Sequence, residues 1–191
     1  MSIRSPSNRQ VEAITISHIL LLDYTNSFRK ILPLYSDKKG GESMSEVKLK
    51  DLLKKENIKI HMKADNWEGA VRIGGEILVQ NGYVEERFVE AVVQTIKTIG
   101  PYMVIYPGLA VPHARPEYGV KKLGMSLITL DEPVNFGSQY NDPVKTIICL
   151  APIDTTSHFK ALELVLKMIH DGSLRGIEKA EDIDEIMKRI H

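Results

Sequence analysis

Two histidines, His113 and His158, stand where an imidazole could take part in chemistry. His113 lies in the segment 107–117, whose three prolines and one glycine exclude a helix interior or a central strand and predict a rigid loop. Arg115 follows two residues later, and an imidazole next to a guanidinium suits phosphate or carboxylate chemistry. On these residues alone, the simpler alternative is a surface loop with an incidental histidine.

His158 is expected in the first turn of a helix that follows a buried strand. Free backbone N–H groups and the positive end of the helix dipole converge there, which favours the neutral imidazole. Such a ring can donate a hydrogen bond to a phosphoryl oxygen or to a second imidazole, although a surface histidine beside an N-cap fits equally well. His113 also lies at the end of a predicted strand. Because the ends of neighbouring strands lie close together, we expect one shared crevice.

A zinc site is the competing use of the two histidines, with a zinc-dependent hydrolase as the competing activity. It would need a third ligand, for which Glu117 and Asp154 are the candidates, but neither an HxH nor an HExxH pattern supports it. The chain has no Walker A motif and no GxGxxG, so nucleotide binding has no local support. A Ser-His-Asp hydrolase is not excluded, but the sequence contains no GxSxG motif of the nucleophile-elbow type.

The hydrophobic pattern predicts the elements that must position the histidines. Helices come first, then a strand-rich centre, then helices again, which predicts an α/β fold: a three-layer α/β/α sandwich with a central mixed sheet flanked by helices. Strands are expected at 59–63, 102–105, 109–111, 123–130 and 144–150, and helices at 47–56, between the N-cap Asp65 and Asn81, and at 84–99, 158–169 and 180–190.

Three side-chain environments follow from this pattern. The pair Gly74-Gly75 inside a helix predicts close helix packing. Ile99 is expected on the apolar face of its helix, and His61 on the solvated face of its strand.

Composition narrows the class of protein. The chain has 25 basic and 25 acidic residues and a net charge of +0, which argues against a broad nucleic-acid-binding surface. Cys149 is the one cysteine and lies in an apolar run, so it is expected to be buried, and a reducing cytoplasm fits. No apolar run approaches the roughly 18 residues of a membrane-spanning helix, and no signal peptide is expected.

From Met44 to its C-terminus, the chain resembles the enzyme IIA domain of the phosphoenolpyruvate-dependent sugar phosphotransferase system, of the mannitol/fructose type. The signature is the segment 107–115, PGLAVPHAR, which is similar to the G-[IL]-A-[VIL]-P-H segment of that family. Supporting matches occur at 65–70, 100–102, 133–137 and 141–144, and their combination looks most like the ascorbate-specific members.

The resemblance implies that His113 accepts a phosphoryl group from phospho-HPr and passes it to enzyme IIB, usually onto a cysteine, for sugar uptake through the membrane IIC transporter. His158 matches the second active-site histidine. Arg115 and Ser157 are expected to stabilise the phosphoryl group, and Lys97 is the nearest equivalent of an arginine that mannitol-type members carry near the site. The resemblance implies a cytoplasmic location. It implies no metal, no cofactor, no nucleic-acid partner and no insertion into the membrane.

The same comparison divides the chain. Residues 1–43 are expected to be an N-terminal extension and linker, either an accessory arm or an extended reading of the start codon, and residues 44–191 the EIIA type 2 domain. The alternative function is a regulatory domain of the same fold that controls partners through its phosphorylation state.

Overall fold

A mixed sheet forms the centre of the computed structural model, which describes residues 47–190; the predicted extension 1–43 lies outside these residues. The strand order is β1-β4-β5-β3-β2. β1 is parallel to β4 and β5 to β3, whereas the β4–β5 and β3–β2 pairs are antiparallel. The strands span Leu53–Met62 (β1), Val104–Tyr106 (β2), Leu109–Ala110 (β3), Gly124–Val134 (β4) and Val144–Ala151 (β5).

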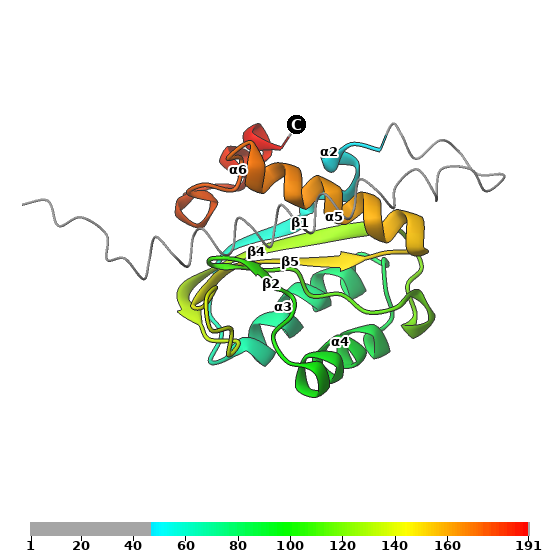
Figure 1. Ribbon diagram of the computed structural model, residues 1–191. Helices are drawn as coiled ribbons and strands as arrows, with labels where there is room; N and C mark the ends of the chain where they lie inside the picture. Colours follow the sequence, from blue (N-terminus) through cyan, green and yellow to red (C-terminus); the bar gives the residue numbers. More distant parts are fainter. Residues whose placement is uncertain (1–46, 191) are drawn as a thin grey trace, which may run out of the picture. The chain divides into compact units, whose positions relative to one another are not determined.

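Helices cover both faces of this sheet. Figure 1 shows α3 and α4 on one face and α5 and α6 on the other, so the predicted three-layer α/β/α sandwich is confirmed. No helix within residues 47–190 has the length and apolar character to cross a membrane. The helices span Leu49–Leu52 (α2), Trp67–Gln80 (α3), Glu86–Ile99 (α4), Thr155–His170 (α5) and Ile183–Arg189 (α6), with 3-10 turns at Pro116–Tyr118 (η2) and Ile177–Lys179 (η3).

β5 is an almost completely buried strand of the sheet. All of its residues except Lys145 are buried, as the apolar run 144–150 predicts for a strand covered on both faces. Cys149 in this strand is buried, and burial raises the pKa of its thiol to about 12, as suits a small core residue.

Two adjacent glycines let α3 approach its neighbours on both sides. A Cβ added at Gly74 would lie 2.7 Å from Sγ of Cys149 in the sheet, and one added at Gly75 would lie 2.8 Å from Cγ2 of Val89 on α4. The prediction of close helix packing is confirmed.

The N-terminal boundary differs from the expectation. The predicted helix 47–56 is wrong beyond Leu52, because β1 begins at Leu53, which pairs with Met125 of β4, and Ile58 pairs with Leu127 after a register shift. This pairing across the sheet outweighs the helix propensity of the local lysines and glutamates.

Smaller corrections concern helix ends. Asn66, and not Asp65, caps α3 by accepting a hydrogen bond from the Gly69 N–H at 2.9 Å. Ile99 is 67% exposed, because it is the last residue of α4 and Gly100 turns the chain away there. α5 begins three residues earlier than expected, and the predicted helix 180–190 shortens to α6 behind the turn η3.

Candidate active site

His113 and His158 follow the same ends of two parallel neighbouring strands. Beyond β3, His113 forms an isolated parallel bridge with Leu150 of β5, supported by the Leu150 N–H donating to the Pro112 carbonyl at 3.0 Å. β5 ends at Ala151, and α5, which carries His158, begins four residues later. The two imidazole ring centroids are 4.7 Å apart at an interplanar angle of 49°, so the expected proximity is confirmed.

A backbone contact fixes the His113 ring. Its Nδ1 lies 2.8 Å from the carbonyl oxygen of Val111. Because a carbonyl oxygen only accepts, Nδ1 must carry the proton in the neutral ring, which leaves the lone pair on Nε2. Val111 is itself fully buried, and its N–H donates to the Met103 carbonyl at 2.8 Å. The ring is therefore oriented from rigid backbone, with Nε2 as the available nucleophile.

Burial keeps both imidazoles neutral. It lowers the pKa of His113, against the smaller opposing effect of the Val111 carbonyl. Burial, together with a smaller charge repulsion from the nearby His113, lowers the pKa of His158 to about 4. At neutral pH, the site therefore presents two uncharged rings, which is the form in which an imidazole nitrogen attacks.

The capped start of α5 holds His158. Oδ1 of Asp154 accepts the Ser157 N–H at 2.6 Å, and the His158 N–H donates to the Asp154 carbonyl at 3.0 Å. Nε2 of His158 is buried and has no hydrogen-bond partner within residues 47–190. An unpartnered buried nitrogen beside a second imidazole is the kind of group that an oxygen of a bound or transferred anion would satisfy.

The structure gives Ser157 a different contact from the one expected. Its side chain is 1% exposed, and its hydroxyl accepts the N–H groups of Ile153 and Asp154 at 3.1 and 3.0 Å while donating to the Asp154 carbonyl. All of these bonds belong to the helix start. A contribution of Ser157 to phosphate stabilisation therefore stays a prediction, and it would act through the position of α5.

The two candidate cations differ in availability. Arg115 is exposed directly before η2, and its guanidinium forms no ion pair within the described residues. Nζ of Lys97, on α4, lies 2.7 Å from Oε2 of Glu68, a carboxylate that also pairs with Arg72. No hydrogen bond or ion pair among residues 47–190 joins Lys97 to either histidine. Arg115 is thus the freer of the two.

Tyr102 is a site neighbour that the sequence interpretation missed. Its ring stands edge-on to His113, with centroids 6.2 Å apart and an angle of 87°. The side chain is 47% exposed, and burial of the remainder raises the pKa of its phenol. In the sequence, the only sign of a role for Tyr102 is its place in the family-like segment 100–102. Its contact with His113 depends on the turn between two strands, which the sequence pattern does not define.

His61, which we expected on the solvated face of its strand, is exposed, and both of its ring nitrogens have partners. Its Nε2 lies 3.0 Å from the Ala180 carbonyl and its Nδ1 lies 3.2 Å from Oδ1 of Asp131. No group of three or more His, Cys, Asp or Glu side chains within residues 47–190 is placed to hold a metal ion.

An α/β/α sandwich with two neutral, half-buried histidines at adjacent strand ends suits a small phosphoryl-transfer domain. The chain belongs to the family described as "Phosphoenolpyruvate-dependent sugar phosphotransferase system, EIIA 2", whose family model matches residues 51–191. It is a phosphotransferase component that carries phosphoryl groups in sugar uptake.

Three similar proteins illustrate the family. The chain is 38% identical over 151 residues to the ascorbate-specific phosphotransferase EIIA component of Salmonella choleraesuis, covering 76% of this chain and 98% of that protein. Its sequence is 28% identical to that of the mannitol-specific cryptic phosphotransferase enzyme IIA of Escherichia coli, which has a solution structure. The TM-score is 0.68, and the match covers 75% of this chain and 97% of that one. Enzyme IIAMTL, solved in complex with phosphorylated enzyme IIBMTL from E. coli, is 26% identical, with a TM-score of 0.62 and coverage of 70% and 93%.

Proposed function

We propose that Nε2 of His113 accepts the phosphoryl group from phospho-HPr and passes it to enzyme IIB in the cytoplasm, for uptake of an ascorbate-type sugar. One observation carries the assignment of the residue. The neutral His113 ring is fixed through Nδ1 to the Val111 carbonyl, 2.8 Å away, and its centroid lies 4.7 Å from that of His158, whose Nε2 has no partner within residues 47–190.

The transfer itself needs positioning more than acid–base chemistry. Nε2 forms a bond to phosphorus while the phosphorus–nitrogen bond to HPr breaks, and the leaving imidazole keeps the electron pair. Nδ1–H stays on His113, where the Val111 carbonyl stabilises the positive charge that the ring acquires. In the second transfer, a nucleophile of IIB, expected to be a cysteine thiolate, forms the new bond to phosphorus and Nε2 regains its lone pair.

Two groups are suited to the phosphoryl oxygens. Nε2 of His158 is a buried nitrogen without a partner in the described residues, and in the tautomer that carries its proton there it donates one hydrogen bond. The guanidinium of Arg115, which forms no ion pair within the described part of the chain and is close in sequence to His113, offers a charge-assisted bond.

Exposed apolar side chains flank both histidines and form the proposed docking face for HPr and IIB. Tyr102 is 47% exposed, Ile153 47% and Tyr118 46%. Tyr102 contacts His113, Ile153 precedes the helix of His158, and Tyr118 lies in η2. Large apolar groups on three segments around one crevice are typical of a protein-binding surface.

The names of similar proteins support ascorbate as the sugar, and the choice of IIB tests it. The phosphorylated chain should transfer its phosphoryl group to the IIB protein of an ascorbate system at least about tenfold faster than to a mannitol IIB, because docking surfaces discriminate partners by free-energy differences of this size. The measurement is the loss of phosphoprotein over time at equal IIB concentrations. Equal rates, or a preference for the mannitol IIB, would contradict the ascorbate assignment and leave the phosphoryl acceptance untouched.

A further inference from the structure

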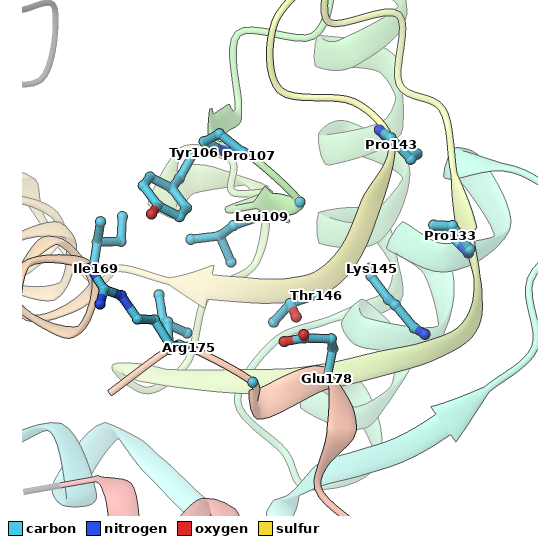
Figure 2. A pocket seen from close by; sticks show the side chains of 13 residues that line it. Tyr106, Pro107, Leu109, Pro133, Pro143, Lys145, Thr146, Ile169, Arg175 and Glu178 are labelled. Atoms are coloured by element: carbon cyan, nitrogen blue, oxygen red, sulfur yellow. The ribbon is translucent and has the colours of Figure 1, made fainter. Parts of the chain in front are cut away.

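A pocket of about 420 Å³ opens on the α5 side of the sheet, at the end away from the histidines. It lies among the last residue of β2, the first residues of β3 and β5, the C-terminal end of α5 and the loop before η3. Its volume falls within the range of about 300–1,000 Å³ typical of small-molecule sites. Figure 2 shows the side chains that line it.

The pocket is separate from the candidate active site. Thr146, which lines it, and Leu150, which pairs with His113, are four residues apart on β5, or about 13 Å at 3.3 Å per residue. Along α5, His158 and the pocket residue Ile169 are eleven residues apart, or about 16 Å at 1.5 Å per residue. A ligand in this pocket would not touch the transferred phosphoryl group.

The charged side chains of the pocket have no protein partners in the described part of the chain. Lys145, Arg175 and Glu178 line it, and none of their side chains forms an ion pair or a hydrogen bond within residues 47–190, although the backbone carbonyl of Arg175 accepts a hydrogen bond from Arg189. In Figure 2, Arg175 and Lys145 stand on opposite sides of the pocket, with Glu178 between them. Two cations and one carboxylate give the pocket a net positive charge and keep both kinds of hydrogen-bonding group available to a ligand.

Thr146, a largely buried residue, adds a hydroxyl to the lining at the same place. The residue is only 6% exposed, yet its hydroxyl forms no hydrogen bond with any residue in 47–190. In Figure 2 it lies beside Glu178 in the view, between the two cations. A hydroxyl without a protein partner at the wall of an open pocket is available to donate to, and accept from, a bound molecule.

The walls are apolar and stiff. Tyr106 and the prolines Pro107, Pro133 and Pro143 form much of the lining. Prolines cannot change their φ angle, so the pocket does not need to order its walls when it binds. The aromatic ring of Tyr106 is a flat surface against which the C–H face of a sugar ring packs, and the prolines add apolar contact.

We propose that this pocket binds a small polyhydroxylated organic anion, either a sugar phosphate or a sugar acid. The planar guanidinium of Arg175 takes the phosphate or carboxylate group. Glu178, Thr146 and Lys145 take hydroxyl groups, and the tyrosine and prolines take the ring. The pocket does not depend on the role of His113, so the proposal stands or falls separately from the proposed phosphoryl transfer.

Isothermal titration of the full-length chain with four compounds tests the proposal. Glucose 6-phosphate or gluconate should bind saturably and at least about tenfold more tightly than inorganic phosphate or glucose, because neither of the latter offers both the anion and the hydroxyls. Preference for glucose 6-phosphate would identify the phosphate form of the ligand, and preference for gluconate the carboxylate form. No saturable binding of either, or equally tight binding of inorganic phosphate, would overturn the proposal.

Variants locate the binding. Arg175→Gln should weaken it about tenfold, through loss of a charge-assisted pair, and Thr146→Val about threefold, through loss of one hydroxyl. Lys179→Gln removes an equal charge from an exposed neighbour outside the lining and should leave affinity unchanged, as should His113→Ala. Unchanged affinity in both Arg175→Gln and Thr146→Val, with folding confirmed by circular dichroism, would place the ligand elsewhere and refute the site.

Discussion

The orientation of one imidazole ring decides which nitrogen of His113 can accept a phosphoryl group. The contact between Nδ1 and the Val111 carbonyl leaves Nε2 open, and burial keeps the ring neutral. The carbonyl belongs to a residue only two positions earlier in the chain, so the rigid proline-flanked loop both presents the histidine and sets its tautomer.

The low pKa of His158 predicts a loss of stability in mild acid. The unfolded chain takes up a proton near the ordinary pKa of 6.5, whereas the folded chain does so only near about 4. The unfolded state therefore binds more protons between these values, and the free energy of unfolding should fall as the pH drops through this window. His113, whose pKa is also lowered, contributes in the same direction.

Urea unfolding of the wild type and of His158→Gln, followed between about pH 7 and pH 5, measures this effect. The paired carboxylates Glu68 and Glu90 have lowered pKa values, so they titrate below that window. The variant, which lacks one of the two depressed imidazoles, should lose less stability across the window than the wild type. Identical slopes, or a wild type that gains stability in acid, would contradict the buried neutral His158.

The sequence predicts the meeting of the two histidines but not their contacts. Each histidine follows a recognisable strand, and neighbouring strand ends meet, so proximity follows from pattern alone. The pairing of Lys97 with Glu68 and the edge-on contact of Tyr102 could not be predicted, because they join side chains from different segments whose positions depend on packing.

At the scale of elements, α3 is fixed between the sheet and α4 by the absence of two side chains. Gly75 faces Val89 so closely that a Cβ would lie 2.8 Å from Cγ2 of that residue. Interiors packed at this density tolerate added carbon atoms poorly.

Gly75→Ala should therefore lower the free energy of unfolding by about 1–3 kcal/mol, the usual cost of overpacking, although alanine is the better helix former. The matched control is Gly69→Ala on the same helix, where an added Cβ meets nothing nearer than 3.7 Å and stability should rise or stay constant. Val89→Ala should restore much of the loss in the double variant. A Gly75→Ala protein as stable as the wild type would show that α4 can move away from α3.

Element prediction succeeds where the pattern is local and fails where pairing is distant. The apolar stripe of α3 and the buried run of β5 identify both elements directly. The stretch after Leu52 looks helical by composition, yet it forms the start of β1 because β4, about seventy residues later in the chain, offers a paired edge. Local propensity contains no information about that partner.

At the scale of the whole molecule, the two histidines and the proposed ligand pocket lie at opposite ends of the same strand and helix within the described residues. His113 and His158 lie at one end of β5 and α5, and the pocket lies at the other. The family model matches residues 51–191, so the known domain accounts for both ends.

A variant that begins at Met44 should fold and accept phosphoryl groups at the rate of the full chain, because the matched domain and both histidines are retained. Thermal unfolding and the initial rate of phosphorylation by phospho-HPr measure the two properties. Loss of folding, or a clearly slower rate, would show that residues 1–43 belong to the working domain. His113→Ala in the same shortened chain is the inactive control for the rate.

The most direct test of the account is the identity of the phosphorylated nitrogen. After incubation with phosphoenolpyruvate, enzyme I and HPr, the chain labelled with ¹⁵N-histidine should show one phosphorus-coupled nitrogen, Nε2 of His113. The signal should persist in His61→Gln, whose ring nitrogens already contact Ala180 and Asp131, and disappear in His113→Ala. A phosphoryl group on Nδ1 or on another histidine, or none with donors active on a control protein, would contradict the assignment.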